Sequence, residues 1–257
     1  MKNKKWLVSI LGAVMLAAGV VLVCLARTGA LAENAQMSGK VFFALSLILA
    51  VLGLVLLILG FVPKRQETDV RTLATAAMFA ALCYIGFSYL RIDIPVGTEK
   101  TAFHLGNVFC VLAALFLGGF WGGMSGAVGM TIADLTSSYV TSAPKTFILK
   151  LGIGLIAGFV AHKLFHLSRD TQRKIPLPVA AVLSCTAGMA FNVVADPLVG
   201  YFYKMYVLGV PQDMATIWAK MGAVTTLVNA IVAVIAASML YLALRPALKR
   251  TNLMPQL

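Results

Sequence analysis

The chain has 257 residues, of which 60% are hydrophobic and only 12% are charged, and this composition excludes an ordinary soluble domain. Apolar runs close to the ~20 residues that cross a bilayer recur along the whole length, and because they are continuous rather than alternating they exclude a transmembrane β-barrel. The net charge of +12 lies mostly in short segments between the runs, where it favours membrane orientation over nucleic-acid binding. The sequence therefore predicts an all-α, polytopic membrane protein.

Eight apolar segments are predicted to be membrane-spanning helices. In chain order they cover residues 6–26, 41–62, 72–90, 104–117, 120–138, 146–164, 177–200 and 221–244. If the amino terminus is inside, thirteen of the twenty-one Lys and Arg residues fall on the inner side. This asymmetry predicts that both termini face the cytoplasm.

The first segment has two interpretations. Its basic start and the stretch Ala30-Leu31-Ala32 are typical of a cleaved signal peptide. However, its apolar run of about twenty residues is longer than the roughly 7–15 residues usual for such signals. We favour an uncleaved helix, and cleavage would leave the rest of the topology unchanged.

A polar stretch over residues 63–71 divides the chain. The two segments before it carry no intramembrane charge, so residues 1–65 are expected to form an accessory two-helix hairpin without an assigned role. Residues 70–248 are expected to form a six-helix substrate-binding core, and residues 249–257 a short cytoplasmic tail.

The few polar residues inside the predicted helices gather at one level of the membrane. Six of them fall in the outer half when the helices alternate in direction: Asn107, Asp134, Lys150, Asn192, Asp196 and Asn229. Ionisable groups inside a bilayer are costly and usually mark a substrate or ion path. Together with Tyr139 and Lys145 in the adjoining loop and helix end, they predict a binding pocket that opens outward.

Each of these residues also has a purely structural interpretation. Asp134 and Lys150 could form an ion pair that serves stability alone, and Asn192 and Asn229 could be interhelical hydrogen-bonding groups. Tyr139 could be an interface anchor. His104 is interpreted as an interface residue, and the loop over residues 91–100 could cap the pocket.

Small residues are predicted to form a smooth strip on one face of the segment over 72–90, in the inner half of the membrane. Ala76 with Ala80, and Ala77 with Ala81, are spaced so that another helix could approach closely. Packing within this chain is the alternative to docking of a partner. The glycines around residues 118–123 predict a tight turn between two antiparallel helices.

No enzyme motif is present. The sequence has no HExxH, GxSxG or Walker A pattern, and its four cysteines lie in apolar runs without CxxC spacing. We therefore expect no catalytic residue, no metal and no cofactor. If the chain takes part in transport, the energy must come from a partner or an ion gradient.

The central region resembles a known family, the substrate-binding S components of energy-coupling factor (ECF) transporters, and within it the riboflavin-type branch. The resemblance rests on these stretches: Leu105-Gly106-Asn107, the glycine-rich turn, Ala133-Asp134-Leu135, Ala143 to Ile148, Lys150 and Gly158. It covers residues 70–248, and the two preceding helices depart from the usual six-helix pattern.

The resemblance implies a subunit in a bacterial plasma membrane that binds a vitamin or related small polar ring compound. It implies as partners a transmembrane T component, docked at Ala76, Ala77, Ala80 and Ala81, and two cytoplasmic ATPases. The alternative is a stand-alone proton- or sodium-coupled transporter that uses Asp134 and Asp196, although no inverted repeat is visible.

Overall fold

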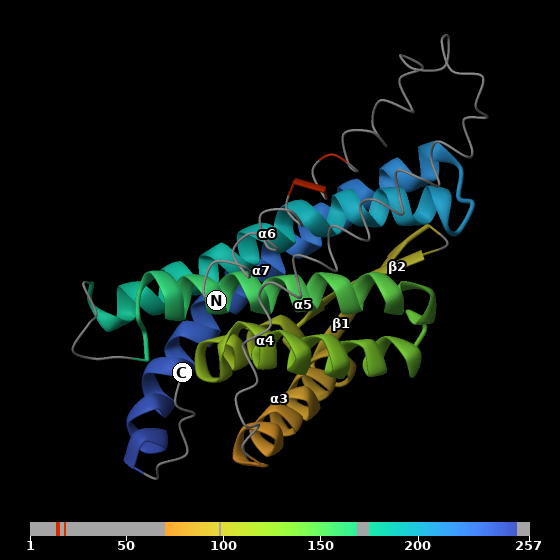
Figure 1. Ribbon diagram of the computed structural model, residues 1–257. Coiled ribbons are helices and arrows are strands. Elements are labelled where there is room, and N and C mark those ends of the chain that lie inside the picture. Colours follow the sequence, from red (N-terminus) through yellow and green to blue (C-terminus); the bar gives the residue numbers. More distant parts are fainter. Residues whose placement is uncertain (1–13, 16–17, 19–69, 98, 169–174, 251–257) are drawn as a thin grey trace. The chain divides into compact units, whose positions relative to one another are not determined.

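The computed structural model describes residues 14, 15, 18, 70–97, 99–168 and 175–250 (Figure 1). The chain divides into two compact units, Met1–Arg65 and Gln66–Leu257, and nearly all described residues belong to the second. The expected helices over 6–26 and 41–62, apart from three positions, lie outside the described residues. So do residues 251–257 of the expected tail.

The second unit is mostly helical (Figure 1). Its elements are α3 (Val70–Ser88), β1 (Arg91–Val96), β2 (Glu99–His104), α4 (Gly106–Leu135), α5 (Ala143–Phe159), α6 (Leu177–Tyr206) and α7 (Gln212–Arg250). A 3-10 turn (Val140–Ser142) precedes α5, and a π-helical turn (Val160–Leu164) follows it. Five stretches of helix in the described residues are long and apolar enough to cross a membrane.

Helix α4 folds back on itself. The sequence predicted separate helices over 104–117 and 120–138, and the structure has one element with a non-helical residue, Gly118, at φ 79° and ψ 176°. Glycine adopts this conformation without the steric cost that a side chain would add. The two arms are antiparallel, since Gly122 faces the backbone of Ala114 and Gly126 faces Cys110 so closely that a Cβ atom would clash.

The second arm of α4 packs against α5 through glycines on both sides. Gly154 of α5 meets Gly123, and Gly158 meets Gly119, at backbone-to-backbone distances that leave no room for a Cβ atom. In a bilayer, close approach of this kind stabilises helix pairs through van der Waals contact. The first arm of α4 is buried continuously from Cys110 to Gly118 and forms the centre of the unit.

The segment between α3 and α4 is a β-hairpin, which the all-α prediction missed. β1 and β2 pair in antiparallel register from Arg91 opposite His104 to Val96 opposite Glu99. Gly97, at φ 63°, makes the turn. A two-stranded hairpin is marginally stable alone, so its contacts with the helices hold it in place.

Helices α6 and α7 extend beyond their predicted ends. Helix α6, predicted over 177–200, runs through Pro197 and continues to Tyr206. The Tyr203 hydroxyl then donates to the Thr141 carbonyl at 2.8 Å, which joins the end of α6 to the turn before α5. The α4–α5 and α6–α7 connections and the hairpin therefore lie at the same end of the helices, here named the pocket end.

The four alanines of α3 divide between two environments. Ala76 is buried, its carbonyl accepts a hydrogen bond from the Ser125 hydroxyl at 2.9 Å, and the Ala80 carbonyl lies against Gly129. Ala77 and Ala81 are exposed. The face of Ala76 and Ala80 thus packs on α4, which corrects the expectation that it receives a partner.

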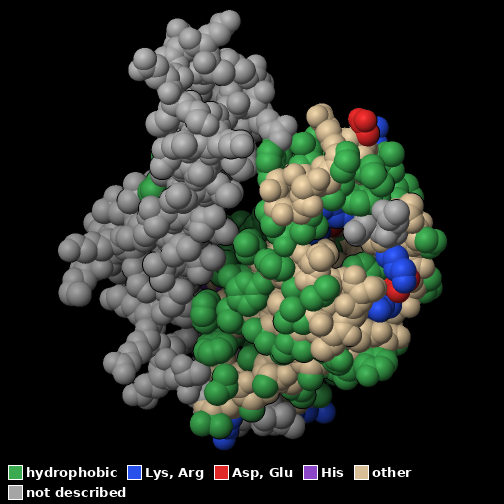
Figure 2. Space-filling model, turned by 90° about the vertical axis from the view of Figure 1, so that its right-hand side faces the viewer, with side chains coloured by type: hydrophobic (Ala, Val, Ile, Leu, Met, Phe, Trp, Pro, Cys, Tyr) green, Lys and Arg blue, Asp and Glu red, His purple; other side chains and the backbone are tan. Residues whose placement is uncertain are grey.

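Hydrophobic side chains are widespread on the described part of the face shown in Figure 2, and charged side chains show at few places on it. Exposed Leu, Ile, Val and Met side chains are spread along α3, α6 and α7. Water does not favour such a surface, whereas lipid chains do.

Candidate substrate-binding site

One pocket at the pocket end collects the polar residues of four helices and the hairpin. All eight residues that the sequence predicted as binding residues line it. They are Asn107 and Asp134 of α4, Tyr139, Lys145 and Lys150 of α5 and the turn before it, Asn192 and Asp196 of α6, and Asn229 of α7. The alternation of helix directions brings these side chains together from positions far apart in the sequence.

Lys150 and Asn107 lie deep in the pocket. The Lys150 ammonium donates a hydrogen bond to Oδ1 of Asn107 at 2.9 Å, and the two residues are only 7% and 1% exposed. Among the described residues, no carboxylate lies within ion-pair distance of Lys150. The structural alternative of a direct Asp134–Lys150 ion pair is therefore absent from this structure, and a buried ammonium has a neutral amide as its hydrogen-bond partner.

Two buried oxygen atoms of the pocket have no protein partner in the described structure. Asp134 contacts the Thr146 hydroxyl, but its Oδ2 atom accepts no hydrogen bond, and neither does Oδ1 of Asn192. The side chains are 2% and 1% exposed, respectively. Because buried acceptors are nearly always satisfied, these atoms are suited to donors supplied by a bound molecule.

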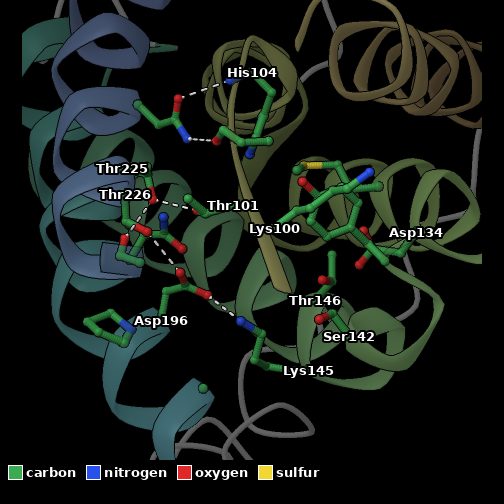
Figure 3. A pocket seen from close by; sticks show the side chains of 18 of the residues that line it. Lys100, Thr101, His104, Asp134, Ser142, Lys145, Thr146, Asp196, Thr225 and Thr226 are labelled. Carbon is green, nitrogen blue, oxygen red and sulfur yellow. Dashed lines mark hydrogen bonds and ion pairs between the residues drawn. The ribbon is translucent and has the colours of Figure 1, made fainter. Parts of the chain in front are cut away.

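Asp196 joins α5 to α7. Its Oδ1 atom pairs with the Lys145 ammonium at 2.9 Å and its Oδ2 atom accepts a hydrogen bond from the Thr226 hydroxyl at 2.8 Å, as Figure 3 shows. Gly200, one turn further along α6, lies beside this lysine, and a Cβ atom there would make an ordinary contact with its Nζ at 3.4 Å. Both carboxylate oxygens are thus engaged within the protein.

Asn229 holds the hairpin. Its Nδ2 donates to the Ala102 carbonyl at 3.0 Å, and its Oδ1 accepts from the His104 backbone N–H at 3.1 Å. The Thr101 and Thr225 hydroxyls, 2.7 Å apart, add a second link between β2 and α7 (Figure 3). Asn229 lines the pocket as predicted, but its amide is hydrogen-bonded to the backbone of β2 and positions that strand.

A cluster of rings and charges joins β1 to the turn before α5. Arg91 pairs with Asp93 at 3.3 Å, and its guanidinium carbon lies 5.3 Å from the centre of the Tyr139 ring. The Tyr139 hydroxyl donates to Asp93 at 3.1 Å. Burial and the Asp93 carboxylate raise the pKa of Tyr139 above its usual value, so the hydroxyl remains a donor. The segment expected to cap the pocket is thus held by α7 on one side and by the turn before α5 on the other.

His104 is a pocket residue that the sequence analysis assigned to the interface. Its ring packs edge-on against Phe87 with centroids 4.8 Å apart, and its Nδ1 is buried without a partner in the described structure. Burial lowers the pKa of His104 to about 3, and the Lys150 charge acts in the same direction. The imidazole is therefore neutral at physiological pH.

Other lining residues were also missed. Thr225 and Thr226 are a polar pair in an apolar helix, one turn from Asn229, and that spacing was a signal that could have found them. Trp218 and Lys204 lie beyond the predicted helix ends and gave no comparable signal. Among the described residues, no group of three or more His, Cys, Asp and Glu side chains could hold a metal ion.

The match to a family model agrees with the resemblance seen in the sequence. The model of the family described as the S component of the ECF-type riboflavin transporter matches residues 67–246, more than half of the chain. No curated protein matches. A crystal structure of the S component for biotin from an ECF-type ABC transporter is similar, with 17% identity, a TM-score of 0.48, and coverage of 69% of this chain and 94% of that one.

The family match confirms the predicted resemblance and, with it, a role as a transporter subunit rather than an enzyme. It spans the hairpin, the whole of α4, α5 and α6, and every lining residue of the pocket. The chain belongs to the family of ECF-type riboflavin transporter S components, the membrane subunits that bind substrate in vitamin uptake.

Proposed function

We propose that this chain binds a vitamin or a related small polar ring compound in the pocket and passes it to partner subunits of an ECF-type transporter. The observation that carries the proposal is the set of buried polar atoms without protein partners, Asp134 Oδ2, Asn192 Oδ1 and His104 Nδ1, around one pocket. Each unsatisfied buried polar group costs about 1–3 kcal/mol, which a bound molecule with matching groups would recover.

The pattern of groups favours a ring whose edge carries both donors and acceptors. Asp134 and Asn192 offer acceptor oxygens, whereas the Lys150 ammonium has donors beyond the one that Asn107 accepts. A ring with neighbouring carbonyl and N–H groups would satisfy both kinds. The pyrimidine edge of the flavin ring has this arrangement, and riboflavin is therefore the first compound to test.

The proposed topology has six membrane crossings, with the two arms of α4 counted separately, and the pocket end facing outward. Lys163, Arg245, Lys249 and Arg250 lie toward the opposite end of their helices. An excess of Lys and Arg marks the cytoplasmic side, so this distribution favours cytoplasmic termini. We place the protein in a bacterial plasma membrane.

The proposed partners are a transmembrane T component and two ATPase subunits, since the chain has no nucleotide-binding motif. The exposed face of α3, which carries Ala77 and Ala81, is the proposed docking surface for the T component. Small side chains on that face let a partner helix approach closely. Ala76 and Ala80 are assigned to internal packing instead.

The test combines binding and uptake. Purified protein in detergent should quench riboflavin fluorescence on binding or carry a related ring compound that mass spectrometry identifies. Lys150→Met should weaken that binding, whereas Lys220→Met, on the exposed surface of α7, is the matched control that should not.

Uptake by cells should require the ATPases and persist when ion gradients are dissipated. Uptake that follows the ion gradient and ignores the ATPases would favour a stand-alone transporter.

A further inference from the structure

Three buried polar side chains of the pocket retain hydrogen-bonding capacity, and they come from three different helices. Oδ2 of Asp134 on α4 and Oδ1 of Asn192 on α6 accept no hydrogen bond from the described residues. Lys150 on α5 has an ammonium with three N–H donors, and among the described residues its acceptor is Oδ1 of Asn107. The remaining capacity is therefore two acceptors and one donor group.

Helix α5 lies between the other two helices. Gly154 meets the backbone of Gly123 in α4, whereas Gly152 lies against the ring of Phe191 in α6. Lys150 therefore belongs to the central helix of the three. Across the pocket, the order of the three groups is acceptor, donor, acceptor.

The two acceptors lie at different depths. Asp134 contacts the Thr146 hydroxyl, which is one turn nearer to the pocket end than Lys150. Figure 3 shows Asp134 and Thr146 on the same side of the pocket. Asn192 lies one turn deeper along α6 than Asp196. Asp134 is thus the outer acceptor and Asn192 the inner one.

We infer that the ligand of this pocket presents an edge with the order donor, acceptor, donor to Asp134, Lys150 and Asn192. The inference rests on the proposed function and narrows its substrate class. An edge of the opposite order would place an acceptor against each of the two buried oxygen atoms. A site built to bond an N–H or O–H group discriminates strongly against an analogue that lacks it, because the protein group then stays unpaired.

Riboflavin has an edge of each kind. Its imide edge, with N3–H between two carbonyls, has the order acceptor, donor, acceptor. The adjoining edge carries N3–H, the C2 carbonyl and the 2′-hydroxyl of the ribityl chain, in the order donor, acceptor, donor. Because the long ribityl chain needs the open side of the pocket, its 2′-hydroxyl should meet the outer acceptor, Asp134. N3–H should then meet Asn192, and the C2 carbonyl Lys150.

The experiment compares three flavins by fluorescence titration into the purified protein in detergent. They are riboflavin, 3-methylriboflavin, which lacks the N3–H donor, and 2′-deoxyriboflavin, which lacks the first ribityl hydroxyl. Each analogue should bind about tenfold or more weakly than riboflavin, because it leaves one buried acceptor without a partner. A ligand held by its imide edge would not distinguish 2′-deoxyriboflavin from riboflavin.

Two variants assign the donors to their acceptors. Asn192→Leu should weaken riboflavin binding and cancel the discrimination against 3-methylriboflavin. Asp134→Leu should do the same for 2′-deoxyriboflavin. Lys220→Leu, on the exposed surface of α7, should keep all three affinities. The quantity compared is the ratio of two affinities in one variant, so that a general loss of stability cancels.

Equal binding of riboflavin and 2′-deoxyriboflavin, or discrimination that neither variant changes, would overturn the inference and leave the proposed function standing. An exchange of the two analogues between the variants would turn the ligand end for end and still support the inferred edge. If a variant binds no flavin, the wild-type affinities decide. If the wild type does not bind riboflavin, the copurifying compound decides: a ring compound with a donor–acceptor–donor edge supports the inference, and one without it overturns it. Absence of any bound ring compound overturns both proposals.

Discussion

The side chain of Asn229 and the backbone of His104 form one hydrogen bond of a two-point clamp: the His104 N–H donates to Oδ1 at 3.1 Å while Nδ2 donates to the Ala102 carbonyl at 3.0 Å. Asn229 is the residue on α7 that fixes the end of β2 over the pocket. Because both polar atoms of its amide are bonded to the backbone of β2, Asn229 is a positioning residue rather than a direct contact for substrate.

Replacing Asn229 by Ala should therefore loosen the hairpin. The two backbone groups lose their partners, which should cost about 1–3 kcal/mol of stability and raise the dissociation rate of bound flavin. Asn229→Asp keeps an acceptor for His104 and should fall between Ala and the wild type. Stopped-flow fluorescence and thermal melting measure the two effects. An unchanged dissociation rate with Ala would show that β2 is not held by this clamp.

Lys150→Met should lower riboflavin affinity by about tenfold to a thousandfold, as for one lost charge-assisted contact. The melting temperature of the ligand-free protein should change little, because Lys150 bonds to Asn107 and makes no ion pair that the substitution would break. Binding and melting are measured on the same preparations. If the substitution collapses stability, Asp134→Asn restores it and affinity never moves, the pair is structural after all.

Asp196→Asn should be more destabilising than Lys150→Met. It removes the charge that neutralises Lys145; breaking a fully buried ion pair costs about 3–5 kcal/mol, and the loss here should be smaller because the two side chains are 15% and 22% exposed. The double variant Lys145→Met, Asp196→Asn should recover part of that loss. Thermal melting of the two single variants and the double variant gives the coupling energy. Strictly additive losses would contradict the pairing.

Ala77→Trp and Ala76→Trp should fail in different ways. Trp at the exposed Ala77 should abolish uptake by blocking the partner helix and leave riboflavin binding to purified protein intact. Trp at the buried Ala76 should displace α4 and lower stability and binding together. Transport assays in cells and binding in detergent separate the two. Normal uptake by the Ala77 variant would remove this face from the docking surface.

Stability should fall as the pH decreases below about 6.5. Burial lowers the pKa of His104 to about 3, so between these values the unfolded chain binds a proton at this residue that the folded chain does not. Above pH 6.5 His104 does not change the free energy of unfolding. Below it, His104 lowers that free energy by up to about 1.4 kcal/mol per pH unit. Melting temperatures of wild type and His104→Gln from pH 7.5 to 5 test this. Parallel curves for the two proteins would show that His104 does not titrate in this way.

The gathering of polar residues could be predicted from the sequence because helix direction alternates and polar side chains inside a membrane are rare. That rule placed Asn107, Lys150 and Asn192 at one level, and the structure brings them to one pocket. Their partners could not be predicted. Whether Lys150 meets Asp134 or Asn107 depends on how far α4 and α5 are rotated about their axes, which spacing along a helix does not specify.

Three other features depended on contacts between distant segments. The hairpin needs α7 to hold it through Asn229 and Trp218, so its short strands looked like a loop. The two alanine faces of α3 lie about 100° apart around the helix, and only α4 decides which one is buried. Helix α6 continues to Tyr206, beyond the end at residue 200 that a bilayer-length apolar run predicted.

The reversal at Gly118 has a consequence for how this pocket can diversify. The arms of α4 and the adjoining α5 touch through Gly122, Gly126 and Gly154 at places where any larger residue would clash. The part of the pocket that α4 and α5 line is thus built on a scaffold whose spacing cannot be retuned by single substitutions. Changes of specificity should be accessible mainly through the hairpin, α6 and α7, so a mutational library confined to those elements should contain most variants with altered ligand preference.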